Sequence, residues 1–295
     1  MKNVVSFIPQ MTADSSFTFF SAEFSEYFHS RHGARQESFG KFAIPTQLAI
    51  KAKQQSLRIL DICYGLGYNT AAALETIWTI NPDCHVELIG LEINLCVPQS
   101  AVKWGLSANW STKYTDVLRQ LAFTQHINSD HLTAKLLMGD ARDLIQSLSK
   151  SGFCADAIFL DPFSLPKCPQ LWTVEFIRHV TQCLHFNGLL ATYSCAAAIR
   201  TAFITAGLSI ASTHPVGRLA PGTIGGWTLK SNAYLYLPLS QQEQEHLLTN
   251  AAVPYRDPQL NDSADSIIKR RIQEQKHLSL EPTSHWRKRW SQFKS

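Results

Sequence analysis

Residues 57–69 read LRILDICYGLGYN, a short apolar run followed by two glycines. Glycine lacks a Cβ, so Gly65 and Gly67 predict a strand-to-helix turn whose backbone passes close to a ligand. A dinucleotide fingerprint needs a third glycine where Thr70 stands, which disfavours NAD and FAD. The acid before the turn, Asp61, is typical of S-adenosylmethionine sites, where it helps to hold the methionine part; a tight turn without a ligand is the alternative. The predicted cofactor contacts of this turn are Asp61, Tyr64, Gly65, Gly67 and Asn69.

Two further acids follow predicted strands and complete the predicted cofactor site. Glu92 ends the strand at 86–91, where a carboxylate can accept hydrogen bonds from both ribose hydroxyls; a solvated charge at a strand end is the alternative. Asp140 ends the strand at 135–138, where an acid commonly contacts the adenine amino group. It can equally cap a helix at 141–149, and the two roles are compatible.

The segment that follows the strand at 157–160 carries the candidate catalytic residue, Asp161. Ligands of open α/β sheets bind beyond the carboxyl ends of the strands, so Asp161 is predicted to face the reaction centre and to orient a target amine. Enzymes that methylate amino groups of nucleic acids carry Asp/Asn-Pro-Pro-aromatic here, and Asp161-Pro162-Phe163 is related to it with one proline fewer. Pro162, Phe163 and Tyr193 are the predicted substrate contacts, although a structural Asp-Pro turn and core roles for Phe163 and Tyr193 are alternatives.

These residues need a scaffold of alternating strands and helices, which predicts an α/β, Rossmann-like fold with a parallel sheet. We expect a β-hairpin or irregular cap at 1–45, a methyltransferase domain at 46–236 and a helical appendage at 237–295. The expected helices are 43–54, 69–80, a helical stretch between the strands 86–91 and 135–138, 141–149, 171–185 and 196–206. The expected strands are 57–62, 86–91, 135–138, 157–160, 188–194 and a terminal β segment at 208–236.

Composition excludes several classes of protein. Of the 295 residues 45% are hydrophobic and 17% charged, as in globular chains. No apolar run reaches the roughly 18–20 residues needed to span a bilayer, and no cleavable leader is visible, which predicts a cytoplasmic protein without a membrane partner. The seven cysteines are odd in number and lack CxxC spacing, which argues against a disulfide framework and a metal site.

The net charge of +4 is unevenly distributed. Residues 269–295 carry a net charge of +6, so the remaining chain sums to −2. A basic end favours a polyanionic partner, and Arg287, Lys288 and Arg289 lie between Trp286 and Trp290, a pattern that suits phosphate contact and base stacking. Packing of the two tryptophans against the domain is the alternative.

The chain resembles the methyltransferase domain of MnmC, the tRNA 5-methylaminomethyl-2-thiouridine biosynthesis enzyme. The resemblance spans about residues 16–227 and is carried by the stretch 20–37, by residues 159–163 with 168–173 (FLDPF and CPQLWT), and by 191–194 (ATYS). It implies an S-adenosylmethionine-dependent enzyme that methylates the aminomethyl group of a tRNA wobble uridine. Two departures stand out: the family's basic stretch near the sheet end keeps a single cation, Arg218, and no flavin fingerprint is present, which implies a stand-alone methyltransferase.

Two other classes of protein compete with this interpretation. Polyamine synthases have a related fold, but usually show two acids around the strand-four loop, where this chain has Ser164 and Leu165 after Asp161-Pro162-Phe163. A non-catalytic RNA-binding protein that retains the fold would not need Asp61, Glu92 and Asp161 together with the glycine turn.

Overall fold

The computed structural model describes residues 7–217, 220–229 and 232–291. The elements before the main sheet are β1 (Pro9–Met11), β2 (Phe17–Ser21), β3 (Glu26–Tyr27), α1 (Ala34–Glu37), the π-helix η1 (Ser38–Ala43) and α2 (Leu48–Lys51). The first half of the main domain comprises β4 (Ser56–Ile62), α3 (Tyr68–Ile80), β5 (His85–Glu92), α4 (Cys96–Lys103), α5 (Thr112–Thr124), β6 (His126–Asn128), β7 (Leu132–Met138) and α6 (Ala141–Ser151).

The second half comprises β8 (Ala155–Leu160), the 3₁₀ turn η2 (Pro169–Trp172), α7 (Val174–Gln182), β9 (Leu184–Thr192), α8 (Ala197–Thr205), β10 (Ser209–Thr213), β11 (Thr223–Gly226) and β12 (Tyr236–Leu237). The C-terminal segment, residues 238–291, contains α9 (Gln241–His246), the 3₁₀ turn η3 (Asn250–Ala252), α10 (Ala264–His277) and α11 (Thr283–Ser291).

The main sheet is mixed, with a parallel centre. Within the described residues its strand order is β12-β10-β11-β9-β8-β4-β5-β7-β6. The run from β9 through β8, β4 and β5 to β7 is parallel, whereas β6 at one edge and β11, β10 and β12 at the other pair antiparallel. The carboxyl ends of β4, β5, β7 and β8 therefore meet at one edge of the sheet, which confirms the predicted Rossmann-like α/β scaffold.

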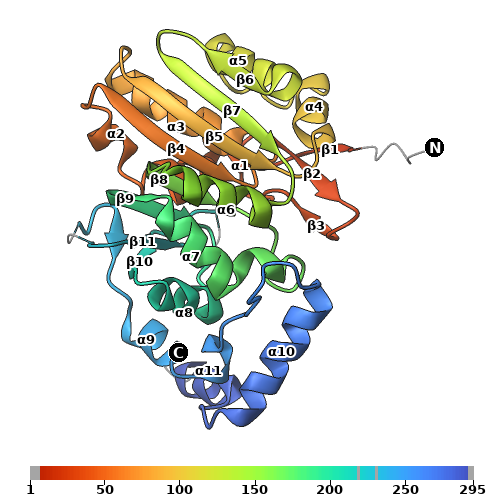
Figure 1. Cartoon of the computed structure of the whole chain (residues 1–295), viewed down its shortest axis with the longest axis vertical. Helices are drawn as coiled ribbons and strands as arrows, with labels where there is room; N and C mark the ends of the chain where they lie inside the picture. The colour runs from red at the N-terminus through yellow and green to blue at the C-terminus, as the bar shows by residue number, and fades with distance from the viewer. Residues whose placement is uncertain (1–6, 218–219, 230–231, 292–295) are drawn as a thin grey trace.

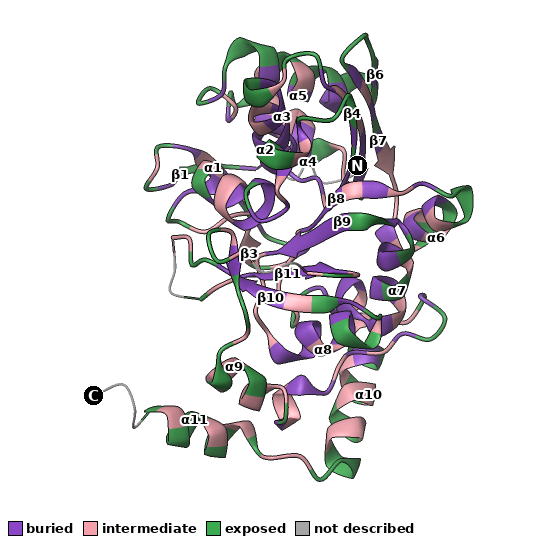
Figure 2. Cartoon of the chain, turned by 90° about the vertical axis from the view of Figure 1, so that its left-hand side faces the viewer, coloured by how far each residue is buried: buried purple, intermediate pink, exposed green. Residues whose placement is uncertain are grey.

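Helices cover both faces of this sheet (Figure 1). Successive residues of a strand point to opposite faces, so Ile59 joins the apolar cluster beneath α3 and α5, whereas Leu60 joins the cluster beneath α6, α7 and α8. The central strands are buried on both sides (Figure 2), which explains why their sequences are nearly continuous apolar runs rather than alternating ones.

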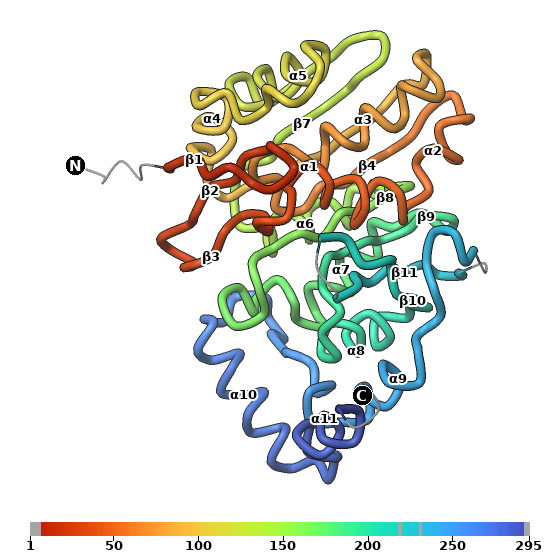
Figure 3. Tube along the Cα trace, turned by 180° about the vertical axis from the view of Figure 1, so that it is seen from behind, coloured from red at the N-terminus to blue at the C-terminus, as the bar shows by residue number. Residues whose placement is uncertain are grey.

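A small antiparallel sheet, β1-β2-β3, lies beside the main sheet and confirms the expected hairpin (Figure 3). Its β2–β3 turn places residues 21–31 against the carboxyl ends of the parallel strands. We call residues 21–31 the N-terminal hairpin tip.

The C-terminal segment lies beside α7 and α8 (Figure 1) and is anchored to α6 and α8 by charge. Arg200 of α8 is almost fully buried and pairs with Glu243 of α9 at 2.8 Å. Arg142 of α6 pairs with Asp257 at 3.1 Å, and the Asp257 side chain is fully buried. Removal of one partner of a buried ion pair is costly, so these two pairs tie the segment to the main domain.

Several predicted boundaries were wrong, for identifiable reasons. The expected helix 43–54 begins earlier, at Ala34, and is interrupted around Pro45, because proline lacks an N–H and disfavours a helical interior. The expected helix 171–185 is shorter: Thr173 caps α7 through its side chain, and β9 already begins at Leu184. The edge strand β6 was not predicted, because its three residues carry no periodic signal.

Candidate active site

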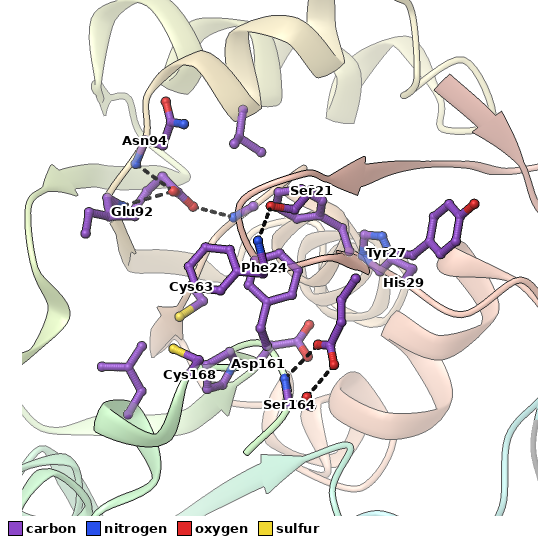
Figure 4. A pocket seen from close by; sticks show the side chains of 18 of the residues that line it. Ser21, Phe24, Tyr27, His29, Cys63, Glu92, Asn94, Asp161, Ser164 and Cys168 are labelled. Carbon is purple, nitrogen blue, oxygen red and sulfur yellow. Dashed lines mark hydrogen bonds between the residues drawn. The ribbon is translucent and has the colours of Figure 1, made fainter. Parts of the chain in front are cut away.

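A cavity of about 480 Å³ opens at the carboxyl ends of the parallel strands, between the glycine turn and the N-terminal hairpin tip. Figure 4 shows Glu92, Asp161 and Phe24 around this space, contributed by β5, by the segment after β8 and by the hairpin tip. Among the described residues, the carboxylates that line it are Glu23, Glu26, Glu37, Glu92, Asp140 and Asp161, against the basic side chains of Arg31 and His29. Such a lining favours a ligand that carries positive charge.

The glycine turn bends sharply between β4 and α3. Gly65 and Gly67 adopt the left-handed conformation, with φ of 56° and 82°. A Cβ on Gly67 would lie 2.6 Å from the Tyr64 hydroxyl, so any other residue would have to displace Tyr64 in addition to adopting a strained backbone conformation. Cys63 is also left-handed, with φ of 67°, a conformation that favours glycine. The turn thus contains three left-handed positions, two of them the glycines at which the sequence predicted a close approach of the backbone to a ligand.

Asp61 and Tyr64 lie behind the turn and are not among the residues that line the cavity. Asp61 is fully buried and accepts a hydrogen bond from the Thr70 hydroxyl at 2.7 Å, while its Oδ1 has no partner among the described residues. Burial raises the pKa of Asp61 to about 7, and the neighbouring charge of Glu92 acts in the same direction. Both side chains therefore support the turn from its core side. Gly67, a third predicted cofactor contact, does not line the cavity either.

Glu92 lines the cavity and holds the turn in place. Its Oε2 accepts from the backbone N–H of Gly65 at 2.8 Å, and its Oε1 accepts from Ile93 at 2.9 Å and Asn94 at 2.8 Å. Burial outweighs these three bonds and raises the pKa of Glu92. A carboxylate offers about four acceptor sites, so these bonds leave one lone pair of Oε2 for a ligand.

Asp140 lines the cavity and caps α6, which is the second of the two roles predicted for it. Its carboxylate accepts from the backbone N–H of Arg142 at 2.9 Å and pairs with the Arg142 guanidinium at 2.8 Å. Burial opposes ionisation, but the hydrogen bonds and charge of Arg142 prevail and lower the pKa of Asp140. Because Arg142 also pairs with Asp257, this wall of the cavity is connected to the C-terminal segment.

Asp161 lines the cavity at the end of β8, and its Oδ2 accepts a hydrogen bond from the Asn69 side-chain amide at 2.8 Å. The loop that follows is held by the protein: the Tyr193 hydroxyl donates to the Pro162 carbonyl at 3.0 Å, and the Trp172 indole donates to the Phe163 carbonyl at 2.9 Å. These bonds cut the freedom of the loop and therefore the cost of keeping Asp161 in place.

The N-terminal hairpin tip closes over this loop and contributes residues to which sequence reasoning assigned no chemical role. Phe24 stacks on Phe163 with ring centroids 4.3 Å apart, and Phe28 meets the same ring edge-on at 5.0 Å. Glu26 accepts a hydrogen bond from the backbone N–H of Ser164 at 3.0 Å and another from its hydroxyl. The tertiary fold therefore brings a second carboxylate to the strand-four loop, although the loop itself carries only Asp161.

His29 of the hairpin tip is also on the cavity wall. Its ring stacks on Tyr68 at 5.2 Å, and its Nδ1 lies 3.4 Å from the Thr18 hydroxyl. Burial lowers the pKa of His29 to about 4, so the imidazole is neutral at pH 7. The signal in the sequence for Glu26 and His29 was their place in the stretch 20–37, which carries part of the resemblance to MnmC.

The predicted tRNA contacts near the C-terminus lie on α11, away from the cavity wall (Figure 1). Arg289 pairs with Glu245 at 2.9 Å and with Glu281 at 2.6 Å. Trp286 stacks on His246 at 4.1 Å, as the packing alternative proposed. Arg287 and Lys288 are exposed, and Arg218 lies outside the described residues.

Membrane-spanning helices and clusters of metal ligands are absent from the part of the chain that the structure describes. No helix there is both long and apolar enough to cross a bilayer. No group of three or more His, Cys, Asp or Glu side chains is placed there to hold a metal ion.

Sequence comparison relates the chain to methyltransferases. Residues 105–226 match the model of a family of S-adenosyl-L-methionine-dependent methyltransferases. An uncharacterized protein of Methanocaldococcus jannaschii, MJ0670, is 27% identical over 277 residues, which cover 90% of this chain and 72% of that protein. The tRNA 5-methylaminomethyl-2-thiouridine biosynthesis bifunctional protein MnmC of Aromatoleum aromaticum is 27% identical over 198 residues, which cover 63% of this chain and 30% of that protein. The match thus spans about a third of the bifunctional relative.

Structural comparison agrees over nearly the whole chain. The crystal structure of MNMC2 from Aquifex aeolicus superposes with a TM-score of 0.81 at 29% identity, and the match covers 94% of this chain and 87% of that one. Fold, family model and relatives together show an MnmC-like methyltransferase domain whose cofactor is S-adenosylmethionine.

Proposed function

We propose that this S-adenosylmethionine-dependent methyltransferase, which carries an MnmC-like domain, methylates the aminomethyl group of a modified wobble uridine in tRNA. The observation that carries the proposal is the position of Asp161 on the wall of an acidic cavity, held by Asn69 at 2.8 Å. The MnmC relatives and MNMC2 support the substrate class.

The residues around the glycine turn suit the cofactor. When bound, S-adenosylmethionine supplies an electrophilic methyl group on a positively charged sulfur. Gly65 offers backbone close to the cavity, Glu92 keeps one free lone pair for a ribose hydroxyl, and Asp140 lies on the wall predicted to contact the adenine. Asp61 and Tyr64 keep the turn in shape from behind, and the acidic lining matches the positive charge of the ligand.

Asp161 deals with the charge of the substrate amine. An aliphatic amine has a pKa of about 10, so it arrives as an ammonium that lacks a lone pair for attack. The Asp161 carboxylate accepts a hydrogen bond from this ammonium, orients the nitrogen and takes its proton, directly or through water. The carboxylate is kept in position by the rigid Pro162 and by two hydrogen bonds to the loop, from Trp172 to the Phe163 carbonyl and from Tyr193 to the Pro162 carbonyl. The nitrogen of the amine can then align with the methyl group.

The exposed cations of α11 are the proposed contacts to tRNA phosphates, because they lie outside the internal ion pairs formed by Arg289. Phosphate contacts position a nucleic acid without reading its sequence. Arg287 and Lys288 would therefore add affinity, while the cavity selects the amine.

The direct test is methyl transfer from S-adenosylmethionine to tRNA that carries aminomethyl-uridine at the wobble position, with the modified nucleosides identified by mass spectrometry. Methylated aminomethyl-uridine is the expected product. Unmodified tRNA should remain unmethylated, because uridine lacks the amine. Absence of product under cofactor saturation, with S-adenosylhomocysteine still bound, would refute the substrate and leave the cofactor assignment intact.

Glu26 favours a second candidate function, aminopropyl transfer to a polyamine. Two carboxylates near the strand-four loop are what a diamine would need, and the hydrogen bonds between Glu26 and Ser164 place the second one there. The lack of a second acid in the loop therefore does not exclude a polyamine synthase. Incubation with putrescine and decarboxylated S-adenosylmethionine separates the two candidates, because only a polyamine synthase yields spermidine.

A further inference from the structure

Asn69 stands where the cofactor turn meets the catalytic loop. It is the second residue of α3, is 4% exposed, and lines the cavity together with Gly65 and Asp161. Its amide is thus buried against the space that the ligands must occupy. Sequence reasoning assigned it to the cofactor alone.

The orientation of the Asn69 amide follows from its partner. Its Nδ2 donates to Asp161 Oδ2 at 2.8 Å, and the reverse orientation would set two acceptor oxygens against each other. The carbonyl Oδ1 must therefore point away from Asp161, and it is buried without a hydrogen-bond partner among the described residues. A buried acceptor without a partner costs free energy, so a site that keeps one is poised to receive a donor.

The surroundings indicate which donor that is. The charged side chains on the cavity wall are mainly carboxylates, among them Glu92 and Asp161, so a cationic N–H group is favoured over a neutral one. An ammonium offers three N–H donors and can bond to Asp161 and to the Asn69 carbonyl at once.

We propose that Asn69 is a positioning residue of the active site: its amide nitrogen holds Asp161, and its carbonyl oxygen accepts a hydrogen bond from an ammonium group in the cavity. This inference rests on the proposed function, since methyl transfer to an amine brings two ammonium groups to this place. One is the α-ammonium of the cofactor and the other is the substrate amine.

Two substitutions separate the two roles of Asn69. Asn69→Ala removes both the donor and the acceptor, whereas Asn69→Asp removes the donor and keeps an acceptor. Asn81→Ala is the matched control, because Asn81 lies at the other end of α3 and its amide donates to the backbone of Ala52. Unfolding by urea reports how far each variant is destabilised.

The acceptor role is tested by affinity. If the α-ammonium of the cofactor is the donor, Asn69→Ala weakens S-adenosylhomocysteine binding by about fivefold to twentyfold. It then leaves methylthioadenosine, which lacks the amino-acid part, unaffected. If the substrate amine is the donor, KM for the aminomethyl-uridine tRNA rises by a similar factor while both nucleosides bind normally. Asn69→Asp retains the affinity in either case.

The donor role is tested by pH. Without the Asn69 N–H, the Asp161 carboxylate loses a bond that stabilises its charged form, so the acidic limb of the kcat/KM profile moves to higher pH. The shift is larger in Asn69→Asp, because two adjacent carboxylates cannot both ionise easily. Asn81→Ala changes stability and leaves this limb in place.

Unchanged affinity for S-adenosylhomocysteine, unchanged KM and an unmoved acidic limb in Asn69→Ala would overturn the proposal. If the wild-type protein does not methylate the tRNA, the proposed function fails by itself. In that case the α-ammonium of the cofactor is the one remaining donor for the Asn69 carbonyl. Equal affinities of wild type and Asn69→Ala for S-adenosylhomocysteine, measured beside methylthioadenosine, would then reject the proposed role of Asn69.

Discussion

The cavity and helix α11 of the C-terminal segment use charge in opposite ways. In the cavity, carboxylates are oriented by short hydrogen bonds from distant elements: Glu92 by the glycine turn, Asp161 by Asn69 and Glu26 by Ser164. In the C-terminal segment, Arg289 is neutralised by Glu245 and Glu281, while Arg287 and Lys288 extend into solvent. Buried, oriented charges act strongly and are screened little by salt, whereas exposed charges act weakly and are screened.

This difference indicates that the basic C-terminus and the acidic cavity serve different steps, namely recognition of a polyanion and chemistry on an amine. Recognition of a polyanion depends on how many exposed cations contact the phosphates and little on their exact geometry. Chemistry on an amine requires one carboxylate in a defined place. Substitutions in the two regions should therefore differ in size and in salt dependence.

The largest effect is expected at Asp161. Asp161→Asn keeps an acceptor but removes the charge that holds the ammonium and takes its proton. The rate of single-turnover methyl transfer should therefore fall at least about tenfold, and a loss of about 10²–10⁴-fold is usual for acid–base groups. Asp161→Ala should fall further, and cofactor binding should stay nearly normal. Raising the pH from 7 to 9.5 should partly rescue Asp161→Asn, because more of the amine is then neutral.

The matched control for this change is Asp156→Asn at the amino-terminal end of the same strand, where the carboxylate accepts from the Arg58 N–H at 2.8 Å. It should leave the transfer rate unchanged. Wild-type rates in Asp161→Asn would reduce Asp161 to a turn residue and remove the contrast between the two regions.

The next largest effect is expected at Glu92. Glu92→Ala should weaken S-adenosylhomocysteine binding by about 1–3 kcal/mol in calorimetry, through loss of the ribose acceptor. It should also lower the free energy of unfolding, because Gly65, Ile93 and Asn94 lose the acceptor of their N–H groups. Glu87→Ala, on the same strand but in an exposed pair with Arg58, serves as control and should change neither quantity by more than about 0.5 kcal/mol. Normal cofactor affinity in Glu92→Ala would limit Glu92 to a structural role.

A smaller effect on stability is expected at Asp61, with a defined pH dependence. The pKa of Asp61 is raised from 3.8 to about 7, so the folded chain retains a proton that the unfolded chain releases. Stability should therefore decline as the pH rises from about 4 to 7 and level off above it. Asp61→Asn cannot ionise, so it should gain at least about 1 kcal/mol over the wild type at pH 8 and little at pH 4.

Urea unfolding at pH 4, 6 and 8 measures this effect, and Asp83→Asn, an exposed aspartate, is the control. A gain that is the same at every pH would contradict the role of burial. Calorimetry on the same variant shows whether Asp61 also supports cofactor binding, as its place behind the turn implies.

The smallest effect is expected in the C-terminal segment. Changing Arg287 and Lys288 together to glutamine should weaken tRNA binding by about 1 kcal/mol at low salt and reduce the slope of log K against log salt by up to about two. Cofactor affinity and stability should stay unchanged. Changing Lys53 and Lys150, two exposed cations elsewhere, to glutamine is the matched control. An unaltered salt slope would show that α11 serves packing alone.

How far the sequence predicts the site depends on whether a residue lies next to a strand end. Gly65, Glu92, Asp140 and Asp161 could each be placed from the apolar run that precedes them, because parallel strands deliver their carboxyl ends to one edge. Glu26 and His29 could not, since no local pattern says which loop a distant hairpin will contact. The hairpin tip joins the cavity through packing of Phe24 and Phe28 on Phe163, a contact between segments more than 130 residues apart.

The sequence by itself determined the alternation of strands and helices, the glycine turn and the order of the acids along the chain, because periodicity and backbone freedom are local properties. The tertiary structure alone decided how each polar group is used. It turned Glu92 toward three backbone N–H groups, linked Asn69 to Asp161 and left the Asn69 carbonyl without a partner among the described residues. These outcomes depend on distances between elements, which burial and packing set and which no single stretch of sequence contains.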